Sequence, residues 1–512
     1  MAALATLTSG CSQDLLPTCA ESETCPQGSS SGTVGEGSSG PGITSGQDTA
    51  STSSSTADSS GAETSSCGCG PEAICVDDAC VPAANGPCEI AWAEPGSSLT
   101  DTIRLGMLLP RGEPFTTFSL SYERAAMLWI EDFAELPGVP HPTWIVCDTG
   151  GSPEQAIEAA EHLATLGVVA VMGPWFSETT DAVDPVLQRA GVLRLSASVS
   201  SPPAPLVWGT EDDPVLHANA VGDHVALVGP DGGPGSAVLL SADDEDGDAW
   251  EAALLGLAEA PPPIAVRYPS SAATQEQWLL GIQQAVDQAW TDNGGNANDV
   301  IVAGSGAGLV ALMMIGRWAQ EPMAGPIPRI VLPRRRGDAL LSLLDAMATS
   351  GSPPIVAAMD AVQATAETTA ATWDEDLLTV FELGYQVRYD DETPAPGAEQ
   401  WFDSAWTLSL LVCARADDPS GTTLAEVFEW LDGSGPVRSL ESFTSTCESL
   451  AAGTPVTPAA VSGPRSWRPQ THLRRGDVRG AALTWPGPAA VEYPRVYVLD
   501  PPPAVTGTWM DQ

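Results

Sequence analysis

The chain has 512 residues, with 66 Asp and Glu against 20 Lys and Arg, so its formal net charge is −46. All 20 basic residues are arginines, which excludes chemistry that needs a lysine: a lysine Schiff base, a pyridoxal phosphate site or a Walker-type phosphate loop. The negative charge repels nucleic acid and anionic lipid headgroups, so we expect no nucleic acid partner, and no apolar run is long enough to predict a transmembrane helix.

Small residues at the end of segment 1–10 precede Cys11. The segment resembles the end of a bacterial lipoprotein signal, in which the cysteine receives a lipid. We therefore expect a protein held to a bacterial membrane only by a lipid on Cys11, outside the cytoplasm, in the periplasm or at the cell surface. The alternative is a frayed terminus with one stray cysteine.

The segment after Cys11 is predicted to be an anchor and tether, over residues 11–66. Gly, Ser and Thr fill 28 of the 39 positions in 28–66, and such a composition cannot bury apolar area. The chain has eleven cysteines, so ten remain if Cys11 is lipidated, an even number suited to disulfides. Five of them fall between 67 and 88, which predicts a small disulfide-rich segment over 67–95. A zinc site fits less well, because Cys-x-Cys spacing is too short and no histidine lies nearby.

From residue 103 onward, apolar strands alternate with amphipathic helices. Expected strands are 103–109, 143–147, 168–172 and 192–195, with helices at 119–133, 153–166 and 178–190. The alternation starts again with strands at 237–240, 264–267, 300–303, 330–332 and 355–358 and helices near 248–259, 274–290, 306–319 and 338–349. Further helices are expected at 374–388, 401–415 and 422–432, followed by short apolar pieces within 455–505. This pattern predicts an α/β protein with two doubly wound, Rossmann-like lobes and a ligand cleft between them.

Several segments, in order, carry a family resemblance. They are 103–110, 113–115, 122–126, 147–153, 171–177, 195–202, 300–307, 401–408 and 462–467. Together they are similar to the type I periplasmic solute-binding proteins, a group that includes branched-chain amino-acid-binding proteins of ABC importers and related receptor ligand-binding domains. The resemblance implies a first lobe over 102–224 and 363–450 and a second lobe over 225–362 and 451–505.

The resemblance also implies ligand-binding positions in the first lobe. Ser177 matches the family's serine at a helix start, and Ser198 and Ser200 match the small-residue loop after the next strand. The start of a helix near 178 would attract an anionic group independently of any resemblance. Ser177 could equally cap its helix. Phe118 matches an aromatic wall position and Trp175 lies beside the serine, although either could be an ordinary core residue.

Two expected positions in the second lobe depart from the family pattern. Asp246, within Asp243–Gly247, stands where a tyrosine that stacks on the ligand is expected, and Arg334 stands where amino-acid binders have an acidic residue. Both changes argue against a simple branched-chain amino acid as the ligand. The acidic run lacks the spacing of an EF-hand calcium loop. The arginines at 334–336 could pair with the chain's own carboxylates, or Arg334 could select an anionic solute.

No catalytic constellation is recognisable, so we expect no enzyme, no cofactor and no metal. Asp148–Gly150 has the tripeptide of aspartic proteases in a single copy, and the five histidines show no metal spacing. The favoured hypothesis is a lipid-anchored solute-binding protein that takes a small ligand to an ABC permease. The alternative is a surface sensory or interaction module that keeps the fold without transport. Cys413 and Cys447 are the only two cysteines in the C-terminal third of the sequence, and we expect them to form a disulfide.

Overall fold

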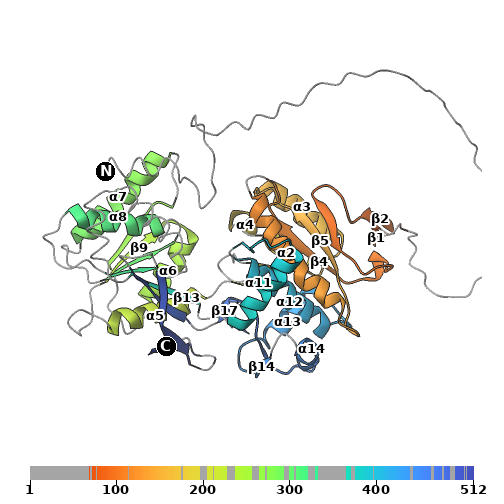
Figure 1. The fold of residues 1–512 in the computed structure, drawn as a ribbon. Coiled ribbons are helices and arrows are strands. Elements are labelled where there is room, and N and C mark those ends of the chain that lie inside the picture. Colours follow the sequence, from red (N-terminus) through yellow and green to blue (C-terminus); the bar gives the residue numbers. More distant parts are fainter. Residues whose placement is uncertain are drawn as a thin grey trace, which may run out of the picture. The chain divides into compact units, whose positions relative to one another are not determined.

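The computed structural model describes residues from Cys69 onward, except for a set of loops. Residues 1–68 lie outside the described part, and with them Cys11 and the predicted tether. The other residues outside it are 70–71, 77, 113–114, 175–176, 197–203, 211–212, 228–236, 257–263, 271–273, 293–298, 305–306, 321–328, 333–364, 371–374, 396, 439–441, 463–465, 476–477, 485–489, 501, 503, 505 and 512. Two large sheets, one in each lobe, organise what is described (Figure 1).

A six-stranded sheet forms the centre of the first lobe. In spatial order its strands are β3 (Cys88–Trp92), β5 (Thr143–Asp148), β4 (Arg104–Leu109), β6 (Ala170–Met172), β7 (Leu193–Ser196) and β8 (Val207–Gly209). All neighbouring pairs are parallel except β3 with β5. Parallel strands need crossovers, and α2 (Thr116–Ala134), α3 (Pro153–Thr165) and α4 (Ser177–Arg189) provide them.

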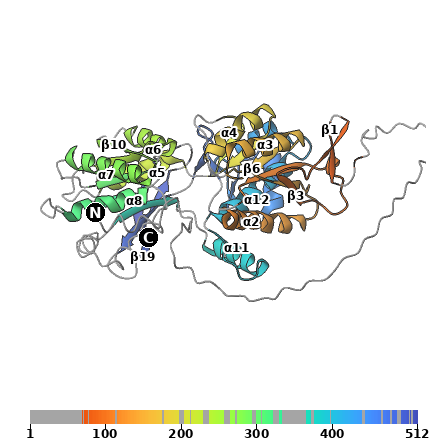
Figure 2. The same ribbon diagram turned by 90° about the horizontal axis from the view of Figure 1, so that it is seen from above.

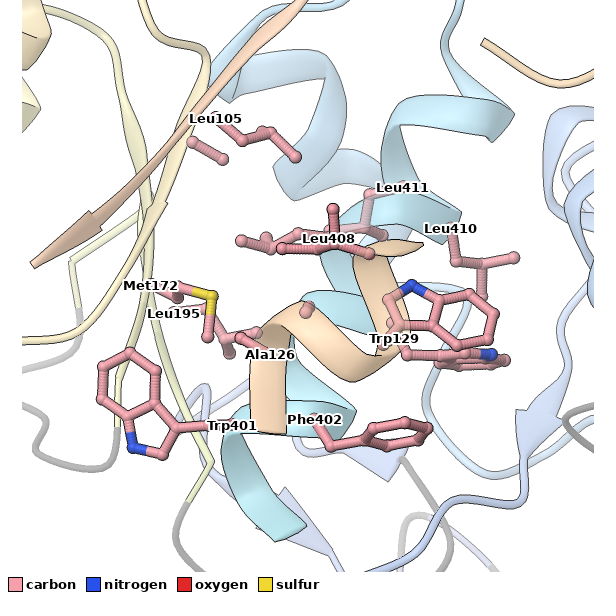
Figure 3. Close-up of a cluster of buried hydrophobic side chains, with 14 of the residues drawn as sticks. Leu105, Ala126, Trp129, Met172, Leu195, Trp401, Phe402, Leu408, Leu410 and Leu411 are labelled. Carbon is pink, nitrogen blue, oxygen red and sulfur yellow. The ribbon is translucent and has the colours of Figure 1, made fainter. Parts of the chain in front are cut away.

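Helices cover both faces of this sheet, as its apolar strands predict. Leu105, Met107 and Leu109 of β4 belong to the core cluster that α2 shares with the C-terminal helices (Figure 3). Leu108, which points the other way, belongs to the cluster under α3 and α4. The period of two along β4 therefore places alternate residues in two separate cores, the arrangement of a parallel sheet buried on both sides.

Four helices late in the chain complete the first lobe: α11 (Glu375–Arg388), α12 (Ala398–Ala414), α13 (Gly421–Phe428) and α14 (Phe443–Ala451). Helix α12 is buried along nearly its whole length and packs against α2 and α14. Cys413 of α12 and Cys447 of α14 form a disulfide with an S–S distance of 2.02 Å. The pairing expected from the sequence is therefore present.

The second lobe is built on an eight-stranded sheet. Its strands in spatial order are β10 (Ile264–Tyr268), β9 (Ala237–Ala242), β11 (Asp299–Ala303), β12 (Arg329–Leu332), β13 (Thr365–Ala370), β18 (Val478–Thr484), β19 (Ala490–Leu499) and β20 (Gly507–Asp511). The first five are parallel and the last three pair antiparallel. Helices α5 (Pro214–Leu227), α6 (Glu245–Leu255), α7 (Gln275–Asp292) and α8 (Ala307–Gln320) accompany the sheet (Figure 2). The doubly wound α/β class predicted from the sequence is confirmed for both lobes.

The cysteine-rich segment is joined to the first lobe. Strands β1 (Ala73–Val76) and β2 (Ala79–Pro82) form a hairpin closed by the Cys69–Cys80 disulfide, and Cys75 is also disulfide-bonded. Cys88, predicted to belong to the same small segment, instead lies in β3 and bonds to Cys147 of β5. Cys88 lies in the first-lobe sheet because its strand, β3, pairs with β5 and covers an edge that would otherwise expose unpaired backbone groups.

Three segments lie in a different lobe from the one the resemblance implied. Strand β13 pairs with β12 and β18 and so belongs to the second lobe, as does α5, which packs against α6 and β20. Residues near 457–462 belong to the first lobe, because β15 (Thr457–Pro458) pairs with β14 (Val437–Arg438) and Asp403 of α12 accepts hydrogen bonds from the backbone of Val461 and Ser462. The predicted helix 338–349 and strand 355–358 lie outside the described residues.

The segments that link the lobes are fastened to each other. Asp213 caps α5 by accepting from the backbone of Val215 at 2.8 Å, and it also accepts from Thr471 at 2.7 Å and from the Arg468 guanidinium. The His472 ring stacks on Trp208 with 4.2 Å between centroids. Two of the linking segments therefore meet in one hydrogen-bonded and stacked contact. None of the described helices is long and apolar enough to cross a membrane.

Candidate ligand site at the strand ends

The carboxyl ends of β4, β5, β6 and β7 lie along one edge of the first-lobe sheet, because these strands are parallel. Asp148 is the last residue of β5, and its Oδ1 accepts hydrogen bonds from the backbone of Arg111 and of Gly150, both at 2.7 Å. The carboxylate of Asp148 thus connects the loop after β4 to the loop after β5. In this position it is a structural acceptor for both loops.

The loop after β6 is held between β4 and β7. Gly173 has a φ of +87°, and a Cβ there would lie 2.3 Å from the carbonyl oxygen of Leu108, so this position requires glycine. Its N–H donates to the carbonyl of Leu195 at 2.9 Å, and the Ser196 hydroxyl donates to the carbonyl of Pro174 at 2.5 Å. The chain is therefore fixed on both sides just before α4 begins.

A buried ion pair ties α4 to β7. Arg194 of β7 donates from Nε to Asp184 Oδ1 at 2.5 Å and from Nη2 to Asp184 Oδ2 at 3.1 Å, and both side chains are buried. Burial lowers the pKa of Arg194, while the negative charges of Asp184 and Asp181 act in the opposite direction. Because the bidentate contact fixes distance and angle together, it sets the direction in which the start of α4 points.

The start of α4 is a candidate anion site at this edge of the first-lobe sheet. The first N–H groups of a helix lack partners within the helix and carry partial positive charge. Thr180, in the first turn of α4, has a buried hydroxyl that makes no hydrogen bond with any described residue. Backbone donors and a spare hydroxyl at the edge of a parallel sheet can bind a carboxylate or a similar anion.

Some of the residues predicted from the sequence can be placed. Ser177 is the first residue of α4, at the edge just described. Phe118 lies in α2 and is half-buried against the first-lobe core, as expected if it is an ordinary core residue. Trp175, Ser198, Ser200 and Arg334 lie outside the described residues, so the structure neither joins them to Ser177 nor separates them from it.

In the second lobe, the acidic run after β9 is largely used for structure. Asp244 is the N-cap of α6 and accepts from the backbone of Gly247 at 2.7 Å, and Asp243 accepts from the backbone of Ser270. Asp246 is the second residue of α6. Asp248 and Glu251 of the same helix bind the Arg267 guanidinium. Within the described residues, no group of His, Cys, Asp and Glu has the arrangement of a metal site.

Trp401, the fourth residue of α12, lies at the same edge and was not among the predicted site residues. Its ring stacks on Tyr122 with 5.7 Å between centroids, and its Cη2 atom lies 3.0 Å from where a Cβ on Gly173 would be. It packs behind the loop that leads into α4. Arg194 was also overlooked, although an arginine between two leucines in a buried strand is a signal for a buried acidic partner.

Comparison with known proteins agrees with this geometry. The sequence profile of the periplasmic binding protein family matches residues 102–312. This range contains five of the six strands of the first-lobe sheet and three of the eight strands of the second-lobe sheet. Residues 102–312 are therefore similar in sequence to the periplasmic binding proteins. No curated protein matches the sequence.

Solved structures with a similar fold cover both lobes of this chain. A solute-binding protein of an ABC transporter from R. palustris, in complex with 4-hydroxybenzoate, has a TM-score of 0.53 and 15% identity, over 78% of this chain and 98% of its own. A second, from Rhodopseudomonas palustris HaA2 with p-hydroxybenzoic acid, has a TM-score of 0.53 and 16% identity over 77% and 96%. An ABC transporter substrate-binding protein from Sphaerobacter thermophilus has a TM-score of 0.52 and 17% identity over 80% and 99%. At sequence identities of 15–17%, the similarity to these structures shows a shared fold and nothing more specific.

Proposed function

We propose that this chain is an extracytoplasmic solute-binding protein, held to a bacterial membrane by a lipid on Cys11, that closes its two lobes on a small carboxylate ligand and delivers it to an ABC importer. The observation that carries the proposal is the start of α4, where Ser177 and the first turn of the helix stand at the carboxyl edge of the first-lobe sheet.

The chemistry of known ligands supports a carboxylate. Two of the similar structures hold hydroxybenzoate, an aromatic ring with one carboxylate. A helix start accommodates that group whatever the rest of the ligand is, because the backbone donors recognise only the anion. The remainder of the ligand would then be selected by the second lobe and by the loop that contains Ser198 and Ser200.

Arg334 is proposed as the second-lobe contact to the ligand. The three arginines at 334–336 are the only run of three basic residues in a chain with a net charge of −46. A guanidinium can hold a carboxylate through two parallel hydrogen bonds, which an ammonium cannot do. A ligand held by Ser177 in one lobe and Arg334 in the other would carry two anionic groups, or one that both lobes share.

The test is a titration of the purified protein with amino acids, aromatic acids and dicarboxylates, each beside its neutral amide, followed by the fluorescence of the 16 tryptophans. We expect saturable binding of a carboxylate and not of its amide. Ser177→Ala should weaken binding about tenfold or more, the loss of one hydrogen bond to a charged group. Ser420→Ala, which removes a serine hydroxyl at the start of another first-lobe helix, α13, should leave affinity unchanged.

Arg334→Ala should weaken binding by about 2–5 kcal/mol, as when one member of a buried charge pair is removed. The exposed Arg267→Ala is its control in the same lobe. Binding that is unaffected by Arg334→Ala, or a preference for uncharged solutes, would remove the arginine from the site. If no solute binds at all, the alternative of a surface sensory or interaction module becomes the better description.

The membrane anchor has its own test. The protein expressed with a complete signal sequence should partition into detergent, and Cys11→Ser should not. Partition that survives Cys11→Ser would contradict lipidation and leave the ligand proposal untouched.

A further inference from the structure

Helix α11 is apolar on two sides. Its inner side carries Phe381 and Tyr385, which are buried; Phe381 packs edge-on against Phe402 of α12, and the Tyr385 hydroxyl donates to Ser121 of α2. These contacts account for how the helix is held on the first lobe. They do not account for the opposite side.

The outer side of α11 exposes Val380, Leu383 and Val387, at 66%, 56% and 85% of their accessible surface. We call these three residues the α11 stripe. Single exposed apolar residues are common on protein surfaces. Three at spacings of three and four residues fall on one line along a helix, the pattern of a seam that pairs with another helix.

The charges around the α11 stripe are acidic. Both nearby arginines are already paired: Arg388 with Glu131, and Arg124 with Glu392. Among the described residues, Asp390 and Asp391 are exposed and follow the end of the helix, three and four residues after Val387. A partner that covers the stripe therefore meets uncompensated negative charge at its rim.

We propose that the α11 stripe is a docking surface for a short helix of another protein that presents apolar side chains along one face and Lys or Arg beside them. Apolar contact would supply the affinity, and the basic residues would pair with Asp390 and Asp391 at the end of the stripe. The α11 stripe lies in the first lobe alone, so this proposal does not rest on the proposed transport function.

A second copy of this chain fits the stripe less well. Two copies would each bring a net charge of −46, which opposes association. A standard interface between globular proteins covers about 800 Å² on each partner, far more than three side chains provide. A single basic helix needs only this small area and gains from the charge.

The probe is a synthetic 16-residue helical peptide with leucines on one face and arginines flanking them, measured by fluorescence anisotropy at physiological salt. We expect wild type to bind it at least tenfold more tightly than the variant Val380→Ser, Leu383→Ser, Val387→Ser. That variant keeps every charge of the chain, and because the three residues are exposed its thermal unfolding should match wild type. Asp390→Asn with Asp391→Asn should weaken binding severalfold and reduce its salt dependence.

A scrambled peptide of the same composition, with its leucines spread around the helix, should bind wild type no better than the serine variant does. Equal binding of the ordered peptide to wild type and to the serine variant would mean that only charge attracts it, and would overturn the proposal. Wild-type dimerisation that the serine variant abolishes would overturn it too, because a second copy would then occupy the stripe.

Discussion

Each lobe contains an arginine that ties a crossover helix to the strand that follows it, and the two ties differ in burial. In the first lobe, Arg194 of β7 binds Asp184 of α4, with exposures of 0% and 7%. In the second, Arg267 of β10 binds Asp248 and Glu251 of α6, with exposures of 42%, 64% and 22%. The same chemistry therefore occupies the same place in two strand–helix–strand units.

The difference in burial predicts that the two ion pairs contribute differently to the stability of the protein. Water can solvate the Arg267 guanidinium when its partners are removed, whereas Arg194 has no access to water and depends on Asp184. A buried charge without its partner is strongly unfavourable, and an exposed one is close to neutral. The first-lobe tie also lies directly under the candidate ligand site, where a change in the angle of α4 would move the anion-binding end of the helix.

The largest effect is expected for Asp184→Ala, which leaves Arg194 buried without its main partner. We expect the free energy of unfolding to fall by about 3–5 kcal/mol in urea denaturation. Asp181→Ala removes a weaker influence on Arg194 and should have a smaller effect. Replacing the pair together, as Asp184→Leu with Arg194→Met, should recover much of the loss. A single variant as stable as wild type would show that the pair contributes little.

The next effect concerns the Cys413–Cys447 disulfide, which closes a loop over a sequence separation of 34 residues. Cys413→Ser with Cys447→Ser should lower the free energy of unfolding by about 3–4 kcal/mol, because the unfolded chain regains conformational freedom. Peptide mapping without reduction should recover the two cysteines linked. Alkylation of both in the native protein would be inconsistent with the bond.

A smaller effect is expected for Gly173→Ala, at the loop before α4. The substitution combines a φ of +87° with a Cβ only 2.3 Å from the carbonyl oxygen of Leu108, and strain of this kind costs about 1–3 kcal/mol. Gly191→Ala is the matched control, because its φ is +69° but no atom lies within 4 Å of the added Cβ. Both substitutions place alanine at a positive φ, so the difference between their melting temperatures measures the steric overlap at Gly173 alone. Equal shifts in melting temperature would mean that the loop before α4 moves to make room for the added Cβ.

The smallest effect is expected for Arg267→Ala, the exposed tie of the second lobe. We expect a loss of about 1 kcal/mol or less, which added salt should reduce further. Measured beside Asp184→Ala under one set of conditions, this variant completes the comparison. A loss as large as that of Asp184→Ala would mean that burial does not distinguish the two ties.

Sequence patterns predicted most of the regular elements, because the apolar strands and amphipathic helices of a doubly wound sheet have distinct periods. The start of α4 was expected at 178 and lies at Ser177. Strand β13 was missed because its sequence, Thr365–Ala370, has almost no apolar character. It is a strand because neighbours pair with it on both sides, which is tertiary context that a local pattern does not contain.

The candidate site was predictable in part for the same reason. A helix start has a local signature, so the position of Ser177 at the start of α4 was predictable from the chain alone, and its role in binding stays a prediction. The contacts of Trp401 with the Gly173 loop join residues more than 200 positions apart, and no local pattern predicts which helix will pack there. The same holds for β3, whose pairing with β5 and disulfide to Cys147 became apparent only in the folded lobe.

The entry of the chain through β3 has a mechanical consequence. Strand β3 forms one edge of the first-lobe sheet, and β8, which leads toward the second lobe, forms the opposite edge. A pull on the residues before Cys69 would be transmitted through the Cys69–Cys80 hairpin and across the Cys88–Cys147 crosslink into the centre of the sheet. Tension at the N-terminus would therefore act first on the hairpin and on the pairing of β3 with β5, before it reached the linking segments around Asp213.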